Sequence, residues 1–246
     1  MTLPFEAPET GTALEAALGR SGYALLQPTT TQQLTGLDHA AWSAMDKWWS
    51  QLPRDTYLKD GGDYRARRHA SLVQDLSTGG LTLAPHRAHW QPTAYNALHG
   101  GMSRWFEPLE SAFSSDAGLR RCITSIGECV ARVRAEPRWF IEVHQVRIDT
   151  AGGIGRPTPE GAHRDGVDFV AVWLAGREGV RGGETRVFEA DGPYGIRFTM
   201  TSPGTALILD DRRVVHETTP IQPDGESGFR DTLVVTYRAG GFMEPE

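Results

Sequence analysis

The chain is poor in cysteine: among its 246 residues only Cys122 and Cys129 carry a thiol. Both lie in one segment with helical periodicity, and their spacing (129 − 122 = 7 residues) corresponds to about two turns, or roughly 10 Å of rise. This distance is too long for a disulfide within one helix. We therefore expect reduced thiols in a reducing compartment.

Long apolar runs are also missing. No window of the sequence approaches the ~18 apolar residues that a membrane-spanning helix requires. The first residues, Met1–Glu6, lack the basic stretch and apolar stretch that begin an export signal. These absences predict a cytoplasmic protein with no membrane partner.

Clustered positive charge is scarce. The formal net charge is −6 and the isoelectric point is ≈ 5.8. The one local basic run is Arg65-Ala66-Arg67-Arg68, which we interpret as a local feature of the chain. Nucleic acids bind to extended surfaces of Lys and Arg, so we expect no nucleic-acid partner.

Residues 1–137 are expected to form a mostly helical flank. Thr12–Leu18 predicts a short helix, and a longer one is expected from Thr31 to Leu52 because its apolar residues recur every three or four positions. Asp116–Val133 carries a third apolar stripe. The aromatic pairs Trp48-Trp49 and Trp105-Phe106 fit packing better than a ligand cage.

Residues 138–240 change character and predict short strands separated by Gly and Pro turns. Such spacing is typical of an antiparallel sandwich or barrel. We therefore expect a single domain over residues 1–246, mainly β with flanking helices, whose core is a double-stranded β-helix of the jelly-roll or cupin-like type. The expected strands are Trp139–Ile148, Val167–Leu174, Thr185–Phe188, Ile196–Met200, Thr205–Leu209, Arg213–Val215 and Thr232–Tyr237.

A His-x-Asp step, His163-Arg164-Asp165, directly precedes one of these strands. Residues i and i+2 of extended backbone project to one side, so the imidazole and the carboxylate can reach one cation. His216 follows 53 residues later (216 − 163 = 53), at the end of another strand, and supplies a third ligand. Two His and one carboxylate on one face, with open positions opposite, are typical of non-heme Fe(II) oxygenases. The alternative for His216 is a histidine in a surface turn.

Three other histidines have no partner at ligand spacing, and we interpret them as surface or packing residues: His86, His89 and His99.

Arg230-Asp231-Thr232 follows the last of these ligands and opens the final strand. An Arg at this place can hold the far carboxylate of a dicarboxylic acid in a two-pronged contact, and the hydroxyl of Thr232 points the same way. Arg230 and Thr232 therefore predict a site for 2-oxoglutarate as co-substrate, beside the Fe(II) and O₂ that the metal ligands imply. The alternative is a surface Arg at the end of a strand.

The second half of the chain resembles the bacterial isoleucine dioxygenase family, which comprises 2-oxoglutarate-dependent hydroxylases of free L-amino acids. By this resemblance the metal and co-substrate roles fall on the residues already named. The stretch Leu174–Glu178 and the residue Ala162 differ from the family pattern, and both are close to the strand that follows His163 and Asp165. The resemblance rests on Glu142–Ile148, Pro157–Asp168, Arg181–Thr185, Leu209–Asp211, His216–Pro220 and Arg230–Val235.

The resemblance implies a small free L-amino acid as substrate, oxidised at an aliphatic carbon. Gln145 and Arg147 share one face by alternation, and Arg147 is a candidate partner for the substrate carboxylate. Glu160 is a candidate acceptor for the ammonium group, and Arg68 is a candidate lid residue. For each of them a structural salt bridge is the alternative.

Other functions remain open at this point. A larger or modified amine-bearing metabolite could take the place of the amino acid, with desaturation or cyclisation in place of hydroxylation. A cupin-like metalloenzyme without 2-oxoglutarate would not need Arg230 and Thr232. A jelly-roll binding module would not need metal ligands with open coordination positions.

Overall fold

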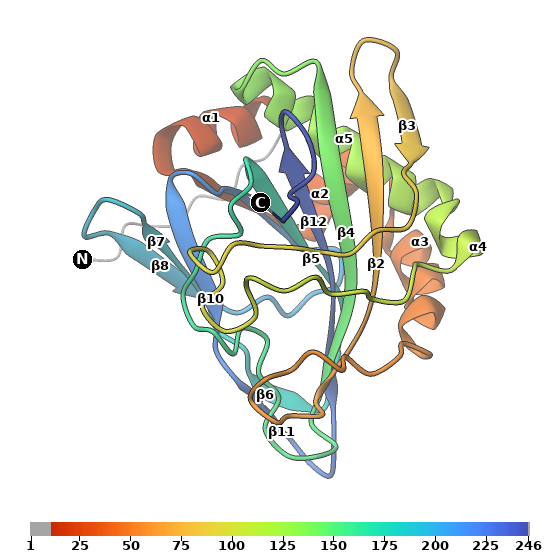
Figure 1. The fold of residues 1–246 in the computed structure, drawn as a ribbon, viewed down its shortest axis with the longest axis vertical. Coiled ribbons are helices and arrows are strands. Elements are labelled where there is room, and N and C mark those ends of the chain that lie inside the picture. Colours follow the sequence, from red (N-terminus) through yellow and green to blue (C-terminus); the bar gives the residue numbers. More distant parts are fainter. Residues whose placement is uncertain (1–10, 246) are drawn as a thin grey trace.

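The structure, a computed structural model, describes residues 11–245 (Figure 1). Residues 1–10, which include the Met1–Glu6 segment expected to lack an export signal, lie outside the described residues. None of the helices in the described part is long and apolar enough to cross a membrane. The helices are α1 (Gly11–Ser21), α2 (Pro28–Thr35), α3 (His39–Met45), the 3-10 helix η1 (Asp46–Trp49), α4 (Ser111–Ser114) and α5 (Ala117–Val133).

One large antiparallel sheet and two smaller ones form the β-structure, as expected for a mainly β fold with flanking helices. The large sheet has seven strands in the order β1 (Tyr23–Leu26), β9 (Ala206–Asp210), β5 (Phe169–Glu178), β12 (Phe229–Arg238), β4 (Arg138–Asp149), β2 (Arg65–Asp75) and β3 (Gly80–Leu83). The smaller sheets are β10 (Val214–Thr218), β7 (Thr185–Glu189) and β8 (Gly195–Phe198), and the pair β11 (Ile221–Pro223) and β6 (Val180–Gly182).

The expected start of the β-core at residue 138 is wrong, because three strands of the large sheet precede it. The longest is β2, which pairs with β4 along its whole length, from Arg65 opposite Ile148 to Asp75 opposite Arg138. The basic residues at the start of β2 show no apolar alternation that would predict a strand. The pairing of its backbone with β4 determines its conformation instead.

The single long helix expected from Thr31 to Leu52 is also wrong. Gly36 ends α2 with φ 70°, a left-handed conformation that glycine adopts without cost. Asp38 then begins α3 by accepting a hydrogen bond from the backbone N–H of Ala41 at 2.9 Å.

Helix α5 follows the prediction. The Asp116 side chain accepts hydrogen bonds from the backbone N–H groups of Gly118 and Leu119 at 2.8 and 3.0 Å, and so caps the helix. Its apolar stripe is buried, and each large aliphatic side chain buried there contributes about 1.5–3 kcal/mol. Cys122 and Cys129 lie in this stripe as free, buried thiols.

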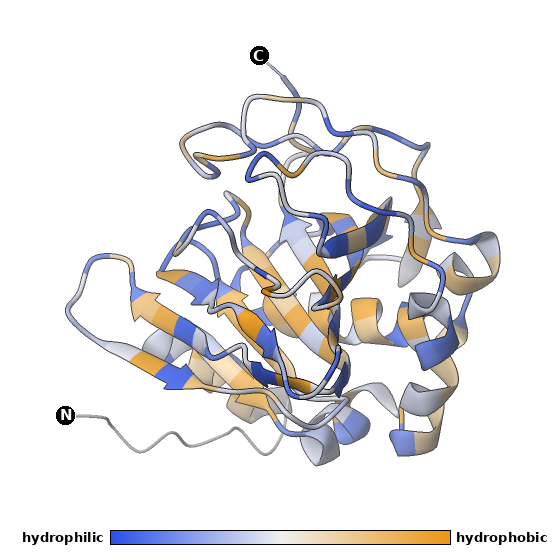
Figure 2. Ribbon diagram, turned by 90° about the horizontal axis from the view of Figure 1, so that it is seen from below, coloured by the Kyte–Doolittle hydropathy of each residue, from blue (hydrophilic) through white to orange (hydrophobic). Residues whose placement is uncertain are grey.

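The helices cover one face of the large sheet (Figures 1 and 2). Buried apolar side chains of the helices and of the sheet form the main core. Trp49 belongs to this core and packs edge-on against Phe113, with ring centroids 5.5 Å apart, so packing is the correct interpretation for this residue. The other face of the central strands carries both polar and apolar side chains, and there the sheet lines a cavity shared with β10.

Candidate active site

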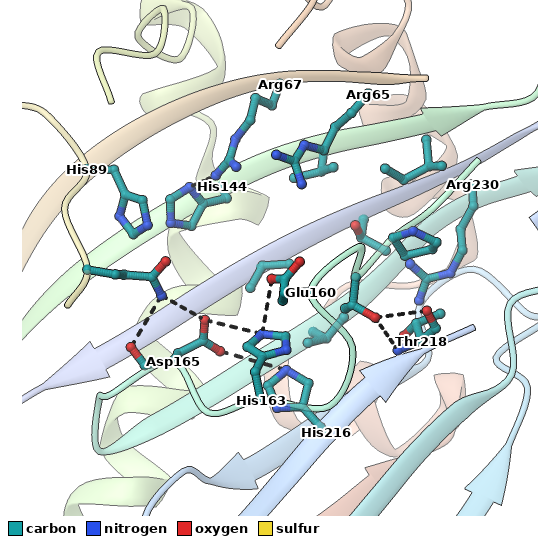
Figure 3. A pocket seen from close by; sticks show the side chains of 18 of the residues that line it. Arg65, Arg67, His89, His144, Glu160, His163, Asp165, His216, Thr218 and Arg230 are labelled. Atoms are coloured by element: carbon teal, nitrogen blue, oxygen red, sulfur yellow. Dashed lines mark hydrogen bonds and ion pairs between the residues drawn. The ribbon is translucent and has the colours of Figure 1, made fainter. Parts of the chain in front are cut away.

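The fold brings His163 and His216 together from distant parts of the chain. His163 lies in the loop before β5, and His216 lies in the middle of β10. Their backbones exchange two hydrogen bonds, of 3.0 Å from the N–H of His163 and 2.9 Å from the N–H of His216. Their ring centroids are 4.7 Å apart. This short bridge holds both imidazoles at one end of the cavity (Figure 3).

Asp165 completes the group. One carboxylate oxygen, Oδ1, lies 3.9 Å from Nε2 of His163, and the other, Oδ2, lies 3.8 Å from Nε2 of His216. Ligand atoms that each bind one cation at about 2.1 Å are separated by roughly 3–4 Å. The predicted triad therefore has the spacing and the donor types that a divalent metal requires.

The two histidines differ in their electrostatics. Burial opposes a charge on His163, but the carboxylates of Asp165 and Glu160 outweigh it and raise its pKa. A bound metal therefore displaces the proton of the charged ring. The Nδ1 atom of His163 lies 2.9 Å from the carbonyl oxygen of Gly161, so Nδ1 carries the proton and Nε2 faces the other ligands. Burial, together with the neighbouring His163, lowers the pKa of His216 to about 4. His216 is therefore uncharged at neutral pH, as metal binding requires.

The loop that carries Asp165 is fixed by Asp211, which directly follows β9. The Asp211 carboxylate accepts three backbone hydrogen bonds, from Asp165 at 2.9 Å, Gly166 at 2.8 Å and Val167 at 3.1 Å. Burial and the negative charge of Asp165 raise the pKa of Asp211 to about 7. Sequence reasoning included Asp211 in the family pattern but gave it no role.

Gln91 provides a second support for Asp165. Its Nε2 donates to Oδ1 of Asp165 at 3.3 Å, and its Oε1 accepts from Nη2 of Arg104 at 2.8 Å. Neither residue was predicted, because the loop from 84 to 110 has no periodicity that reveals which side chains turn inward.

Arg230 and Thr232 line the same cavity, as expected for residues two apart on a strand. Arg230 is buried, and its Nε and Nη2 atoms have no hydrogen-bond partner. Burial, with the positive charge of Arg177 nearby, lowers the pKa of Arg230 to about 10. A buried guanidinium with free donors is suited to a ligand carboxylate, so the residues present fit 2-oxoglutarate.

Glu160 lies where the substrate hypothesis requires it, in the cavity wall. Its Oε1 accepts a hydrogen bond from Nδ2 of Asn96 at 3.3 Å and lies 3.7 Å from Nε2 of His163. Its Oε2 is buried and has no partner. A free carboxylate oxygen is thus available to a cationic group in the cavity.

The expectation that Gln145 and Arg147 face the cavity is wrong. Both point to the opposite face of β4, toward the helices. The Gln145 side chain donates to the carbonyl oxygen of Trp48 at 2.8 Å. Arg147 forms a two-pronged ion pair with Asp231, at 2.7 and 2.6 Å. Alternation predicts that two residues share a face but does not identify which face.

Arg68 is not among the residues that line the cavity. Its Nη1 donates to the carbonyl oxygen of Pro108 at 3.0 Å, and its Nη2 lies 3.8 Å from Glu110. The structural alternative therefore describes Arg68 better than a lid does.

The neighbours of Arg68 on β2 do line the cavity. Arg65 and Arg67 project into it from one face of the strand, with Arg104 from the following loop. In the basic run, Arg65 and Arg67 alternate with Ala66 and Arg68. Because no strand was predicted there, this alternation did not indicate that two arginines share a face.

A second group of buried titratable residues, with potential ligand atoms within 4.8 Å of one another, comprises His69, His89, Glu142 and His144. Of these, His89 and His144 line the cavity. The Glu142 carboxylate already accepts from His89 at 2.9 Å and lies 3.3 Å from His69. Arg67 contacts Nδ1 of His144. The pairing favours a hydrogen-bonded wall over a second cation site. The interpretation of His89 as a surface or packing residue misses its place in the cavity wall.

Comparisons with known proteins agree with this geometry. Residues 46–236 match the model of the 2OG-Fe dioxygenase family. A crystal structure of a bsmA homologue from Methylobium petroleophilum PM1 is 51% identical in sequence, covers 100% of both chains and superposes with a TM-score of 0.94. No curated protein matches the chain.

Two more distant structures share the fold. IDO from Bacillus thuringiensis is 16% identical, with a TM-score of 0.74 over 99% of both chains. The Fe(II)/(alpha)ketoglutarate-dependent dioxygenase TqaL is 16% identical, with a TM-score of 0.70, over 93% of this chain and 86% of that one. The jelly-roll core predicted from the strand pattern is thereby confirmed.

The family match excludes the two alternatives that do without 2-oxoglutarate, a cupin-like metalloenzyme of another class and a binding module. It spans well over half of the chain and contains the histidines, the carboxylate and the arginine described above. The chain belongs to the 2OG-Fe dioxygenase family and is an oxidoreductase that uses Fe(II), 2-oxoglutarate and O₂.

Proposed function

We propose that the protein hydroxylates an aliphatic carbon of a small free L-amino acid. The observation that supports this most is the composition of one cavity wall. The predicted metal ligands, the unpartnered guanidinium of Arg230 and the unpartnered carboxylate oxygen of Glu160 all border the same space (Figure 3). The resemblance of residues 140–240 to isoleucine dioxygenases supports the same substrate class.

His163, Asp165 and His216 are the proposed ligands of the metal. Arg230, with the Thr232 hydroxyl beside it, would hold the far carboxylate of 2-oxoglutarate. The formal charges then balance: +2 for the metal and +1 for Arg230 against −1 for Asp165 and −2 for 2-oxoglutarate. When bound, Fe(II), 2-oxoglutarate and O₂ supply the oxidation of the substrate C–H bond, and 2-oxoglutarate leaves as succinate and CO₂.

Glu160 would fix the substrate by its ammonium group. Its Oε1 is already held by Asn96, so Oε2 remains in position to accept a hydrogen bond. A charge-assisted bond in a buried site is stronger than a neutral one and also sets the direction of the molecule.

The test is a panel of free L-amino acids incubated with Fe(II), 2-oxoglutarate and O₂, with products identified by mass spectrometry. We expect at least one amino acid to gain one oxygen atom, with matching succinate. A product that has lost two hydrogens would assign desaturation or ring closure instead. Succinate formation without oxidation of any amino acid would contradict the proposed substrate and favour a larger amine-bearing metabolite.

A further inference from the structure

Three buried arginines line the cavity in addition to Arg230. Arg65 and Arg67 lie two apart on β2 and share one face of the strand. Arg104 joins them from the loop after β3, where its backbone pairs with that of His89. Their exposed fractions are 6%, 8% and 2%. Arginine is seldom buried without paired negative charge, so the partners of these three side chains identify what they can bind.

Their contacts with acidic groups are too few for three charges. Asp55 serves two of them, with its Oδ2 2.7 Å from Nε of Arg65 and 3.8 Å from Nη1 of Arg67. Arg104 donates to the neutral amide of Gln91. One buried donor on each arginine has no hydrogen-bond partner: Nη2 of Arg65, Nε of Arg67 and Nε of Arg104. Buried donors without partners destabilise a fold, so a ligand that accepts from them gains binding energy.

The arginines also act on one another. Burial, and next the positive charge of Arg65, lower the pKa of Arg67 to about 9 even though Asp55 opposes the shift. The pKa of Arg104 is lowered by the same two causes. An anion among the three would relieve both the repulsion and the loss of hydration.

This group is separate from Arg230. Arg65 and Arg230 both lie opposite Ile148, on the two strands that flank β4. Two strand spacings correspond to roughly 10 Å between the backbones. Figure 3 likewise shows Arg65 and Arg67 apart from Arg230, on the cavity wall across from the metal ligands. The far carboxylate of 2-oxoglutarate at Arg230 therefore leaves this group available.

We propose that Arg65, Arg67 and Arg104 form the binding site for a carboxylate group of the organic substrate. The inference rests on the proposed function and deepens it. With Glu160 as the acceptor for the ammonium group, the cavity presents positive and negative groups to a zwitterion and selects a free amino acid over its ester or amide. Arg147, the candidate from the sequence, cannot serve because it lies on the other face of the sheet.

A binding experiment tests the site without turnover. The Fe(II)- and 2-oxoglutarate-loaded protein is titrated without O₂ in a calorimeter with isovalerate and with isovaleramide, which have the same shape but differ in charge. We expect the wild type to bind the carboxylate about tenfold or more tightly than the amide. In Arg67→Gln and in Arg104→Gln the preference should fall to about threefold or less.

Arg68→Gln is the matched control, because Arg68 follows Arg67 on β2 but does not line the cavity; its preference should equal that of the wild type. Circular dichroism checks the fold of each variant, and if Arg67→Gln does not fold, Arg104→Gln decides. Equal or undetectable binding of the two probes by the wild type would overturn the proposal. The proposal would also be overturned if the folded variants kept the wild-type preference for the carboxylate. It would likewise be overturned if they kept that preference and lost affinity for 2-oxoglutarate.

The same experiment separates this proposal from the proposed function. If the carboxylate preference depends on Arg67 but no amino acid in the panel is oxidised, the carboxylate site is supported and the substrate is another carboxylate. If an amino acid is oxidised but the carboxylate preference is absent, the proposed function is supported and the proposed arginine site is wrong.

Discussion

The Asp211 carboxylate accepts a hydrogen bond of 2.9 Å from the backbone N–H of Asp165, one of the three predicted metal ligands. The next two N–H groups of the loop bond to the same carboxylate. The direction of the Asp165 side chain therefore depends on a residue that does not belong to the triad itself.

Asp211→Ala should weaken metal binding by roughly 10–100-fold, as is typical when an outer partner of a ligand is lost. The reason is that three backbone donors lose their acceptor and the loop is no longer fixed. Metal affinity is measured by competition with a chelator. Asp211→Asn, which keeps one carbonyl oxygen, should lose less. If both variants bound metal as the wild type does, Asp211 would have no part in positioning Asp165.

Arg230→Ala should raise the concentration of 2-oxoglutarate needed for half-maximal turnover by roughly thirty- to several-thousand-fold. This corresponds to the loss of about 2–5 kcal/mol from a buried two-pronged contact. Arg238→Ala is the matched control, because Arg238 lies on the same strand, donates to the carbonyl of Gly241 and does not line the cavity. Unchanged 2-oxoglutarate saturation in Arg230→Ala, or a shift in the control, would show that another residue holds the co-substrate.

Arg147→Ala should lower stability by about 1.5–3 kcal/mol, because the largely buried Asp231 loses two charged hydrogen bonds. Denaturant unfolding measures this loss. The control is Arg138→Ala on the same strand, whose ion pair with Asp75 is more exposed and should contribute less than about 1 kcal/mol. If Arg147→Ala strongly weakened substrate binding and left the stability unchanged, Arg147 would be a substrate-binding residue and this account of it would be wrong.

The sequence predicted that His163 and Asp165 lie together, and likewise Arg230 and Thr232, because each of these two pairs depends on local geometry. His163 and Asp165 share a side by alternation, and so do Arg230 and Thr232. The order of the strands was not needed for either inference, and the structure places all of these residues in one cavity wall.

The sequence could not predict which face of a strand is the inner one. On β4 the expected pair was odd-numbered, whereas the cavity takes His144, Val146 and Ile148. The register against β12, with Thr232 opposite Val146, decides this, and register is a tertiary property. The same limit hid Arg65 and Arg67, whose alternation acquires meaning only once β2 is paired with β4.

The central claim is that His163, Asp165 and His216 hold the metal to which 2-oxoglutarate binds. The most direct measurement is the visible charge-transfer absorption that develops when a 2-oxo acid chelates protein-bound Fe(II), recorded without O₂. We expect the wild type to develop this band on addition of 2-oxoglutarate. His163→Ala, Asp165→Ala and His216→Ala should each lose the band and all turnover while keeping the far-ultraviolet circular dichroism of the wild type. A band of full intensity in any of these three variants would contradict the account.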